Sequence, residues 1–201
     1  MSPRYVRIAV EGKADTGIAQ KLLDHADLRI TGQIIVRHGT GNLDKLIAAC
    51  SKTAKASSPW VVLRDCDSAC PVELRERLLG PSPANPHFVL RLATSMSEAW
   101  LLADHEGFSR YFSVQIGRLP DAPDEEPHAK RSLLHLVESS RNKRMQSDVV
   151  GQHGRPGKLY VDRINEFAQK YWDIDRAATR SPSLKSALIR LSELRERLPE
   201  P

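Results

Sequence analysis

The sequence predicts an α/β fold in which a mostly parallel sheet is flanked by helices and followed by a helical C-terminal part. Over the first half, short apolar segments rich in β-branched residues alternate with amphipathic helical patterns. This alternation is typical of parallel strands joined by right-handed crossovers. The second half has further helical patterns but no clear strand pattern. We therefore expect an α/β core at residues 1–105 and a helical extension at residues 106–201 that packs on it.

The individual elements follow from the same patterns. The expected strands are the apolar segments at residues 5–10, 33–36, 60–63 and 88–92. Helical patterns separate them at residues 16–26, 43–54 and 71–79. The last of these begins with Pro71, which is tolerated there because the first N–H of a helix has no partner within the helix. Further helices are expected at residues 97–104, 106–112, 131–139, 158–171 and 183–198, with loops at residues 119–127 and 151–157.

The composition is that of a folded, soluble protein. Of the 201 residues, 40% are hydrophobic and 27% are charged, which is close to the average of globular domains. No apolar stretch approaches the ~20 residues of a membrane helix, and the N-terminus lacks the apolar segment of a signal peptide. The three cysteines have neither the spacing of a disulfide framework nor that of a zinc site. We expect a cytoplasmic protein with reduced thiols and no membrane partner.

The net charge of +5 permits a nucleic-acid partner without requiring one. The excess positive charge is not concentrated in a terminal tail. Two interpretations are open for the basic residues of the second half, a patch that contacts nucleic acid or an ordinary solvated loop. These residues are Arg141, Lys143, Arg144, Arg155 and Lys158.

Acidic residues follow two of the expected strands. Glu11 comes directly after the first strand, and Asp65 and Asp67 come after the third. The carboxyl ends of parallel strands line the ligand crevice of open α/β sheets, so these carboxylates should lie near one another. An extended backbone would place Asp65 and Asp67 on the same side. Because Mg²⁺ prefers oxygen ligands and is usually held by a few carboxylates, the pattern predicts a metal site. A solvated turn is the alternative for the two aspartates.

Two further acids have both a functional and a structural interpretation. Asp15 is expected at the start of the first helix, either as a metal ligand or as a first-turn acid that stabilises the helix by about 1 kcal/mol. Glu98 either joins the metal site or forms a capping box with Ser95, in which its side chain bonds back to the helix start. Trp100, which follows, is expected in the core.

The order of these motifs resembles the Toprim domain, the Mg²⁺-dependent module of topoisomerases, primases and overcoming-lysogenization-defect (OLD) nucleases. One apolar strand leads into residues 11–15 (EGKAD), and a later one leads into residues 65–67 (DCD). A closer resemblance is to the small bacterial DUF4276 family, Toprim-like proteins often encoded beside an ABC-type or SMC-like AAA ATPase. Its most family-specific string is at residues 97–104 (SEAWLLAD), and the likeness continues through residues 172–184, so it spans nearly the whole chain.

The resemblance implies a Toprim-like fold and a role for each matched acid. It implies Glu11 as a metal ligand or general base, Asp65 and Asp67 as metal ligands, and Asp15 as a ligand of a second metal. Two ions about 4 Å apart would stabilise the attacking and leaving oxygens of a phosphodiester. Mg²⁺ is the implied cofactor, and Mn²⁺ should substitute for it. OLD-type sites often contain a later lysine that stabilises the transition state, and Lys158 is the candidate by its position after a glycine-rich loop.

We therefore expect Mg²⁺-dependent hydrolysis of DNA or RNA by a nuclease of a bacterial phage- or plasmid-defence system. Gly12-Lys13 lacks the flanking residues of a Walker A loop, so the expected ATPase partner would be another polypeptide. The alternative is a non-catalytic accessory subunit that binds such an ATPase and nucleic acid or a nucleotide. Nucleotidyl transfer of the primase kind is a third option. The apolar faces of the C-terminal helices would also suit a homodimer.

Overall fold

The computed structural model describes residues 4–67, 69–80, 85–94 and 96–199. In this part of the chain, the sheet contains five parallel strands in the order β2-β1-β4-β5, with β3 also paired to β1. The strands are β1 (Arg4–Val10), β2 (Leu28–Ile30), β3 (Ile35–Val36), β4 (Trp60–Asp65) and β5 (Phe88–Ala93). The α/β fold with a parallel sheet flanked by helices is therefore confirmed.

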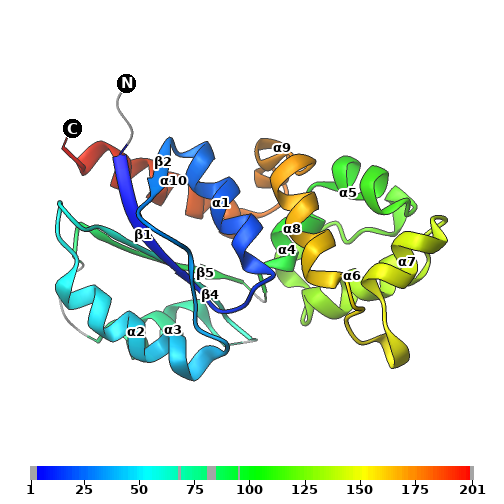
Figure 1. Cartoon of the computed structure of the whole chain (residues 1–201), viewed down its shortest axis with the longest axis horizontal. Helices are drawn as coiled ribbons and strands as arrows, with labels where there is room; N and C mark the ends of the chain where they lie inside the picture. Colours follow the sequence, from blue (N-terminus) through cyan, green and yellow to red (C-terminus); the bar gives the residue numbers. More distant parts are fainter. Residues whose placement is uncertain (1–3, 68, 81–84, 95, 200–201) are drawn as a thin grey trace.

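Helices cover both faces of the sheet (Figure 1). They are α1 (Asp15–His25), α2 (Thr40–Thr53), α3 (Pro71–Leu79) and α10 (Pro182–Arg197). Side chains of β4 alternate between the two faces, so Val61 and Leu63 pack with α1 and α10, whereas Trp60 and Val62 pack with α2 and α3. Because both faces are covered, β4 is apolar at consecutive positions.

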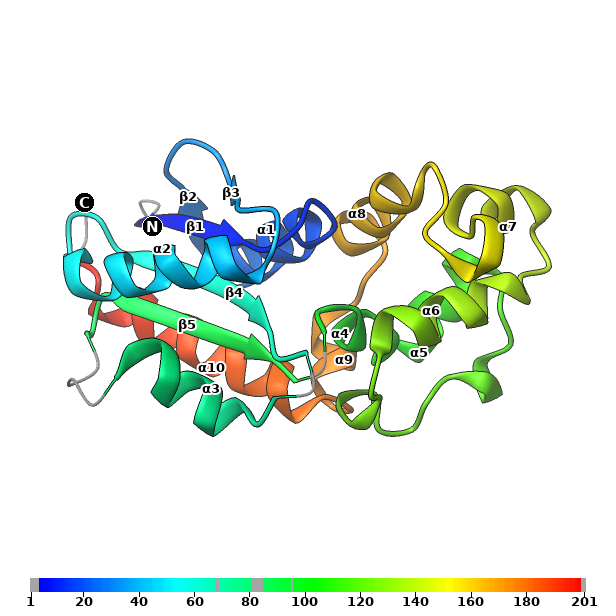
Figure 2. The ribbon, with the colours of Figure 1, turned by 90° about the horizontal axis from the view of Figure 1, so that it is seen from below.

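The remaining helices lie beyond the carboxyl ends of β4 and β5, beside the sheet (Figure 2). They are α4 (Glu98–Leu102), α5 (His105–Phe112), α6 (Ala129–Glu138), α7 (Lys143–Val149), α8 (Tyr160–Lys170) and α9 (Ile174–Ala178), with short 3-10 turns at Ile116–Arg118, Pro123–Glu125 and Gln152–Gly154. The chain then returns to the sheet as α10, and one continuous apolar cluster joins the α1 and α10 face of the sheet to these helices.

The helical part packs closely on α1, which covers the sheet, and it contains a buried aromatic group of its own. The side-chain oxygen Oδ1 of Asn165 in α8 accepts a 2.7 Å hydrogen bond from the backbone N–H of Gly17 in α1. A Cβ atom at Gly17 would lie 2.8 Å from the Cα of Asn165, so only glycine allows this approach. Phe108, Phe112 and Phe167 form a buried aromatic group, with the rings of Phe108 and Phe112 4.4 Å apart.

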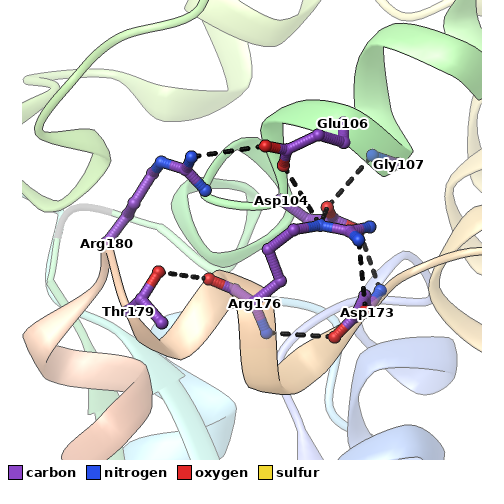
Figure 3. A network of polar contacts seen from close by, with 7 residues as sticks. All are labelled: Asp104, Glu106, Gly107, Asp173, Arg176, Thr179 and Arg180. Carbon is purple, nitrogen blue, oxygen red and sulfur yellow. Dashed lines mark hydrogen bonds and ion pairs between the residues drawn. The ribbon is translucent and has the colours of Figure 1, made fainter.

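The string at residues 97–104 is largely structural. Trp100 is fully buried, as expected, and its indole N–H donates to Oγ of Ser183 at 2.7 Å. The carboxylate of Asp104 is also fully buried, and it accepts from the N–H of Gly107 at 3.0 Å and from that of Asp173 at 2.8 Å. The Nε of Arg176 lies 2.6 Å from the same carboxylate (Figure 3). Asp104 therefore joins the start of α5 to α9.

The strand β2 and the helices α7 and α9 were not expected from the sequence. Each is short, with three, seven and five residues respectively. A side-chain cap begins each of the two helices, because Asn142 accepts from the N–H of Arg144 and Asp173 accepts from that of Arg176. Among the described residues, no helix is both long and apolar enough to cross a membrane.

Candidate active site at the carboxyl ends of the strands

Glu11 and Asp65 lie at the ends of two neighbouring strands. Glu11 follows β1, and Asp65 is the last residue of β4. The two strands pair in parallel, with Ala9 opposite Val62, so their carboxyl ends reach the same edge of the sheet. The structure therefore brings the two sequence motifs together at the edge where ligands bind in open α/β sheets.

Asp15 is the first residue of α1, and its carboxylate turns back toward the end of β1. Its Oδ2 accepts a 2.8 Å hydrogen bond from the N–H of Gly12. Its Oδ1 accepts a 2.6 Å hydrogen bond from the hydroxyl of Ser97, which lies 82 positions away. Burial raises the pKa of Asp15, although the bonds from Ser97 and Gly12 act in the opposite direction. Asp15 is thus a first-turn acid whose carboxylate also faces the other acidic motif.

Ser97 links the two motifs directly. While its hydroxyl donates to Asp15, its backbone N–H donates to Oδ1 of Asp65 at 2.9 Å. Ser97 is only 3% exposed, so these bonds are shielded from water. The sequence indicated Ser97 only as part of a helix start, and its position directly before Glu98 is the one signal that could have marked it as a site residue.

Glu98 begins α4, and its partner comes from the helical part. Its Oε1 accepts a 2.6 Å hydrogen bond from the hydroxyl of Tyr160, the first residue of α8. The ammonium of Lys130 lies 3.9 Å from the same oxygen and 4.9 Å from the centroid of the Tyr160 ring. Burial raises the pKa of Glu98, whereas the bond from Tyr160 and the charge of Lys130 lower it.

This arrangement bears on the capping-box interpretation of Glu98. The proposed cap, Ser95, lies outside the described residues. A capping box requires the Glu at the third helical position. α4 begins at Glu98 itself, so this carboxylate is at the first position. The side chain bonds to Tyr160 instead, and the charge of Glu98 acts on Asp65, so Glu98 lies with the other acids of the site.

Asp67 has a different environment from Asp65. The extended backbone that we expected through both residues ends at Asp65, and Asp67 has a φ of 49° in the left-handed region. Its carboxylate lies 3.3 Å from a guanidinium nitrogen of Arg64, which also pairs with Asp44 at 3.1 Å. The same guanidinium donates to the backbone carbonyl of Asp65. Arg64 therefore bonds to both ends of the turn that separates the backbone conformations of Asp65 and Asp67, and the charge of Asp67 still acts on Glu11.

The group formed by Glu11, Asp15, Asp65 and Glu98 is called the acidic centre below. Burial and the negative charges of Asp67 and Asp15 raise the pKa of Glu11 to about 7. Burial raises the pKa of Asp65 well above its usual range, and the charges of Asp15 and Glu98 add to this effect. Carboxylates that raise one another's pKa in this way are stabilised as anions by a cation between them.

The donor atoms of the acidic centre suit a hard cation, but their present positions do not form a complete site. As the side chains lie here, no three Asp, Glu, His or Cys groups in the described ranges converge closely enough to hold a metal ion. Ser97 and Tyr160 occupy oxygens of three of the acids. The Oε2 of Glu11, by contrast, is buried without a hydrogen-bond partner. Carboxylate oxygens are the ligands that Mg²⁺ prefers.

Two lysines differ in their relation to this centre. Lys158, the sequence-based candidate, is exposed, and no hydrogen bond or ion pair places it against an acid among the described residues. Lys130 contacts Glu98 instead. No spacing or motif marked Lys130 or Tyr160 in the sequence, because both reach the centre only through the packing of α6 and α8.

Comparisons with known proteins add a distant structural likeness. No family model and no curated protein matches the sequence. Among solved structures, the chain is similar to the C-terminal region of the Burkholderia pseudomallei OLD protein, with 18% identity and a TM-score of 0.46 over 99% of this chain and 100% of that one.

Proposed function

We propose that this protein hydrolyses phosphodiester bonds of nucleic acid in a Mg²⁺-dependent reaction at the acidic centre. The observation that carries the proposal is that four carboxylates from three separate segments lie at the carboxyl edge of the sheet, where Ser97 links two of them and burial and mutual charge raise the pKa values of Glu11 and Asp65. Burying several carboxylates together is costly unless they are protonated or neutralised by a cation. At neutral pH a bound divalent cation would remove this cost.

The residues of the centre have separable roles in this proposal. Asp65 and Asp15 would be metal ligands, and Glu98 would complete the set. The bonds from Ser97 and Tyr160 leave further lone pairs free on these carboxylates, so they would orient the ligands and stay in place when a cation binds. When bound, Mg²⁺ would supply charge stabilisation for the phosphodiester oxygens. Glu11, whose pKa is raised to about 7, is suited to accept a proton from water near neutral pH.

Lys130 is the side chain proposed to stabilise negative charge on the reacting phosphate. Its ammonium lies at the acidic centre, 3.9 Å from Glu98, and its side chain is 40% exposed. A lysine that is both fixed against a buried acid and open to solvent can contact a phosphate oxygen of a bound strand. A fixed positive charge next to the reacting phosphate stabilises the negative charge of the transition state. This role replaces the one expected for Lys158.

The biological setting is a further part of the proposal. The sequence resemblance supports a role in phage or plasmid defence beside an ABC- or SMC-like ATPase. The chain itself has no Walker A motif, so nucleotide-dependent control would come from that separate partner.

The first experiment combines metal binding with cleavage. Mn²⁺ is titrated calorimetrically into the wild type, Glu11→Gln and Asp65→Asn, and the same proteins are incubated with plasmid DNA, single-stranded DNA and RNA. We expect saturable binding and Mn²⁺-dependent cleavage by the wild type, with both lost in Asp65→Asn. Asp121→Asn is the matched control, because Asp121 is an exposed acid in the loop between two 3-10 turns and is not one of the acids of the centre. No metal binding by the wild type, with or without nucleic acid, would overturn the proposal.

A further inference from the structure

A groove of about 950 Å³ runs along the outer edge of β5, between α3 and α10. Figure 2 shows β5 at this side of the sheet, with α3 and α10 next to it. The walls are mainly apolar and include Phe88, Leu90 and Leu92 of β5 and Val72 and Leu79 of α3. Val72 is 64% exposed, although it is a large aliphatic residue. The groove is separate from the acidic centre, because none of the residues that line the groove belongs to that centre.

The floor of the groove is the unpaired edge of a strand. The N–H of Trp60 donates to the carbonyl of His87 at 2.9 Å, and that of Cys66 donates to the carbonyl of Ala93 at 3.0 Å. The odd-numbered residues of β5 therefore direct their backbone groups toward β4, and the alternation of the ladder directs those of Leu90 and Leu92 into the groove. No loop or side chain within the described residues bonds to these groups.

The groove is also positively charged. Arg91 of β5 donates to Oγ of Ser186 at 3.0 Å, while its Nε is buried without a hydrogen-bond partner. Burial lowers the pKa of Arg91 to about 10, and the like charges of Arg190 and Arg75 act in the same direction. Lys52 and Arg75 line the groove as well, and Glu76 is the acid among the lining residues. An anion in the groove would relieve the repulsion among these cations.

We infer that the edge of β5 binds an extended acidic segment of a partner protein as an added parallel or antiparallel strand. Backbone N–H and C=O groups of the segment would pair with those of Leu90 and Leu92, which is how exposed sheet edges bind peptides. Apolar side chains of the segment would pack against Phe88 and Leu79, and its carboxylates would lie near Arg91 and Arg75.

Two other occupants fit these features less well. A second copy of the chain paired through β5 would bring two sets of arginines together, and such like-charge contacts oppose association. A nucleic-acid strand would supply negative charge, but its phosphates only accept hydrogen bonds. Donors to the carbonyls of Leu90 and Leu92 would have to come from bases or sugar hydroxyls, which do not repeat at the strand spacing as the N–H groups of an added peptide strand do.

The test uses the full chain and a panel of fluorescein-labelled octapeptides in which Val or Ile alternates with Glu or Asp. We expect anisotropy to show saturable binding of at least one acidic peptide. We also expect slower hydrogen exchange at the amides of Leu90 and Leu92 in the complex. Methylating alternate peptide nitrogens on one edge, or replacing the acids by Lys, should weaken binding at least tenfold. The assay is run without metal, so its result is independent of the chemistry proposed for the acidic centre.

Charge variants of the groove complete the test. Arg91→Gln and Arg75→Glu should each weaken peptide binding by about tenfold or more, which corresponds to about 1.4 kcal/mol. Arg75 is an exposed helix residue, so its variant keeps the test decisive if Arg91→Gln does not fold. Arg77→Glu, which changes an exposed residue of α3 outside the groove, should bind like the wild type. The inference fails if no acidic peptide binds, if Lys peptides bind equally well, if the two amides gain no protection, or if a single-stranded oligonucleotide protects them instead.

Discussion

The hydroxyl of Tyr160 donates a 2.6 Å hydrogen bond to Oε1 of Glu98, although the two residues are 62 positions apart. Each is the first residue of its helix, Glu98 in α4 and Tyr160 in α8. Burial and the charge of Glu98 raise the pKa of Tyr160 well above its usual range, so the phenol remains a donor at neutral pH. Through this bond the helical part of the chain contributes to the acidic centre and not only to the core.

Removal of that donor should weaken metal binding. In Tyr160→Phe, Glu98 loses the hydrogen bond that favours its charged form, so its pKa should rise further. Partners that orient metal ligands typically contribute 10–100-fold to metal affinity, and we expect a loss of about that size in Mn²⁺ titration. Tyr171→Phe is the control, because Tyr171 is 52% exposed. Equal affinities of the two variants would contradict a role of Tyr160 in the centre.

The raised pKa of Glu11 predicts opposite effects of pH on stability and on metal binding. The native state holds the proton of Glu11 up to about pH 7, whereas the ordinary value is 4.5. The neutral form of Glu11 therefore stabilises the folded state at low pH. This stabilisation is lost as the pH rises from the ordinary pKa of 4.5 through the folded-state pKa of about 7. In EDTA, thermal melts should show that Glu11→Gln loses less stability than the wild type between about pH 5 and pH 8.

Metal affinity should rise with pH, whereas the stability of the metal-free protein falls, because the cation binds the ionised carboxylates. Mn²⁺ affinity of the wild type should increase from about pH 6 to pH 8, and added Mn²⁺ should raise the melting temperature more at the higher pH. The difference in melting temperature between the metal-free wild type and Glu11→Gln should therefore change between pH 5 and pH 8. An unchanged difference would show that Glu11 is not the titrating group.

The two candidate lysines can be separated by parallel substitutions. Lys130→Met should reduce cleavage by about 10²–10³-fold, the usual effect of removing one group that stabilises transition-state charge. Lys158→Met should leave cleavage near the wild-type rate, because Lys158 is exposed and Lys130 contacts the acidic centre. Single-turnover rates at saturating Mn²⁺ make the comparison. A larger loss in Lys158→Met would restore the sequence-based assignment.

Gly107→Ala should test the buried Asp104 network of Figure 3. A Cβ atom at Gly107 would lie 2.1 Å from Oδ2 of Asp104. That carboxylate cannot move aside, because Asp173 and Arg176 also bond to it. We expect a destabilisation of about 1–3 kcal/mol, as for other overpacked sites, which would lower the melting temperature by several degrees. Gly117→Ala is the control, since no atom lies within 4 Å of its added Cβ. Equal melting temperatures of the two variants would contradict this account.

The sequence by itself determined the alternating part of the fold and the two acidic motifs. The strands β1, β4 and β5 and the helix α3 lie where their apolar periodicity and the proline at the helix start predicted them. Strand direction then required Glu11 and Asp65 to reach one edge of the sheet. These features depend on local period and chain direction, which a sequence displays. The short elements β2, α7 and α9 escaped prediction because two or fewer turns, or three strand residues, produce no measurable period.

Only the tertiary structure decided which residues complete the acidic centre. Ser97 reaches Asp15 across 82 positions, and Tyr160 reaches Glu98 across 62. Such contacts depend on how whole helices pack, here on the close approach of α1 and α8 at Gly17. The different environments of Asp65 and Asp67 were likewise decided by contacts, because Arg64 bonds to the carboxylate of Asp67 and to the backbone carbonyl of Asp65. Periodicity gives the face of a helix that is buried, but the partner on the other side of the interface is set by packing of segments distant in sequence.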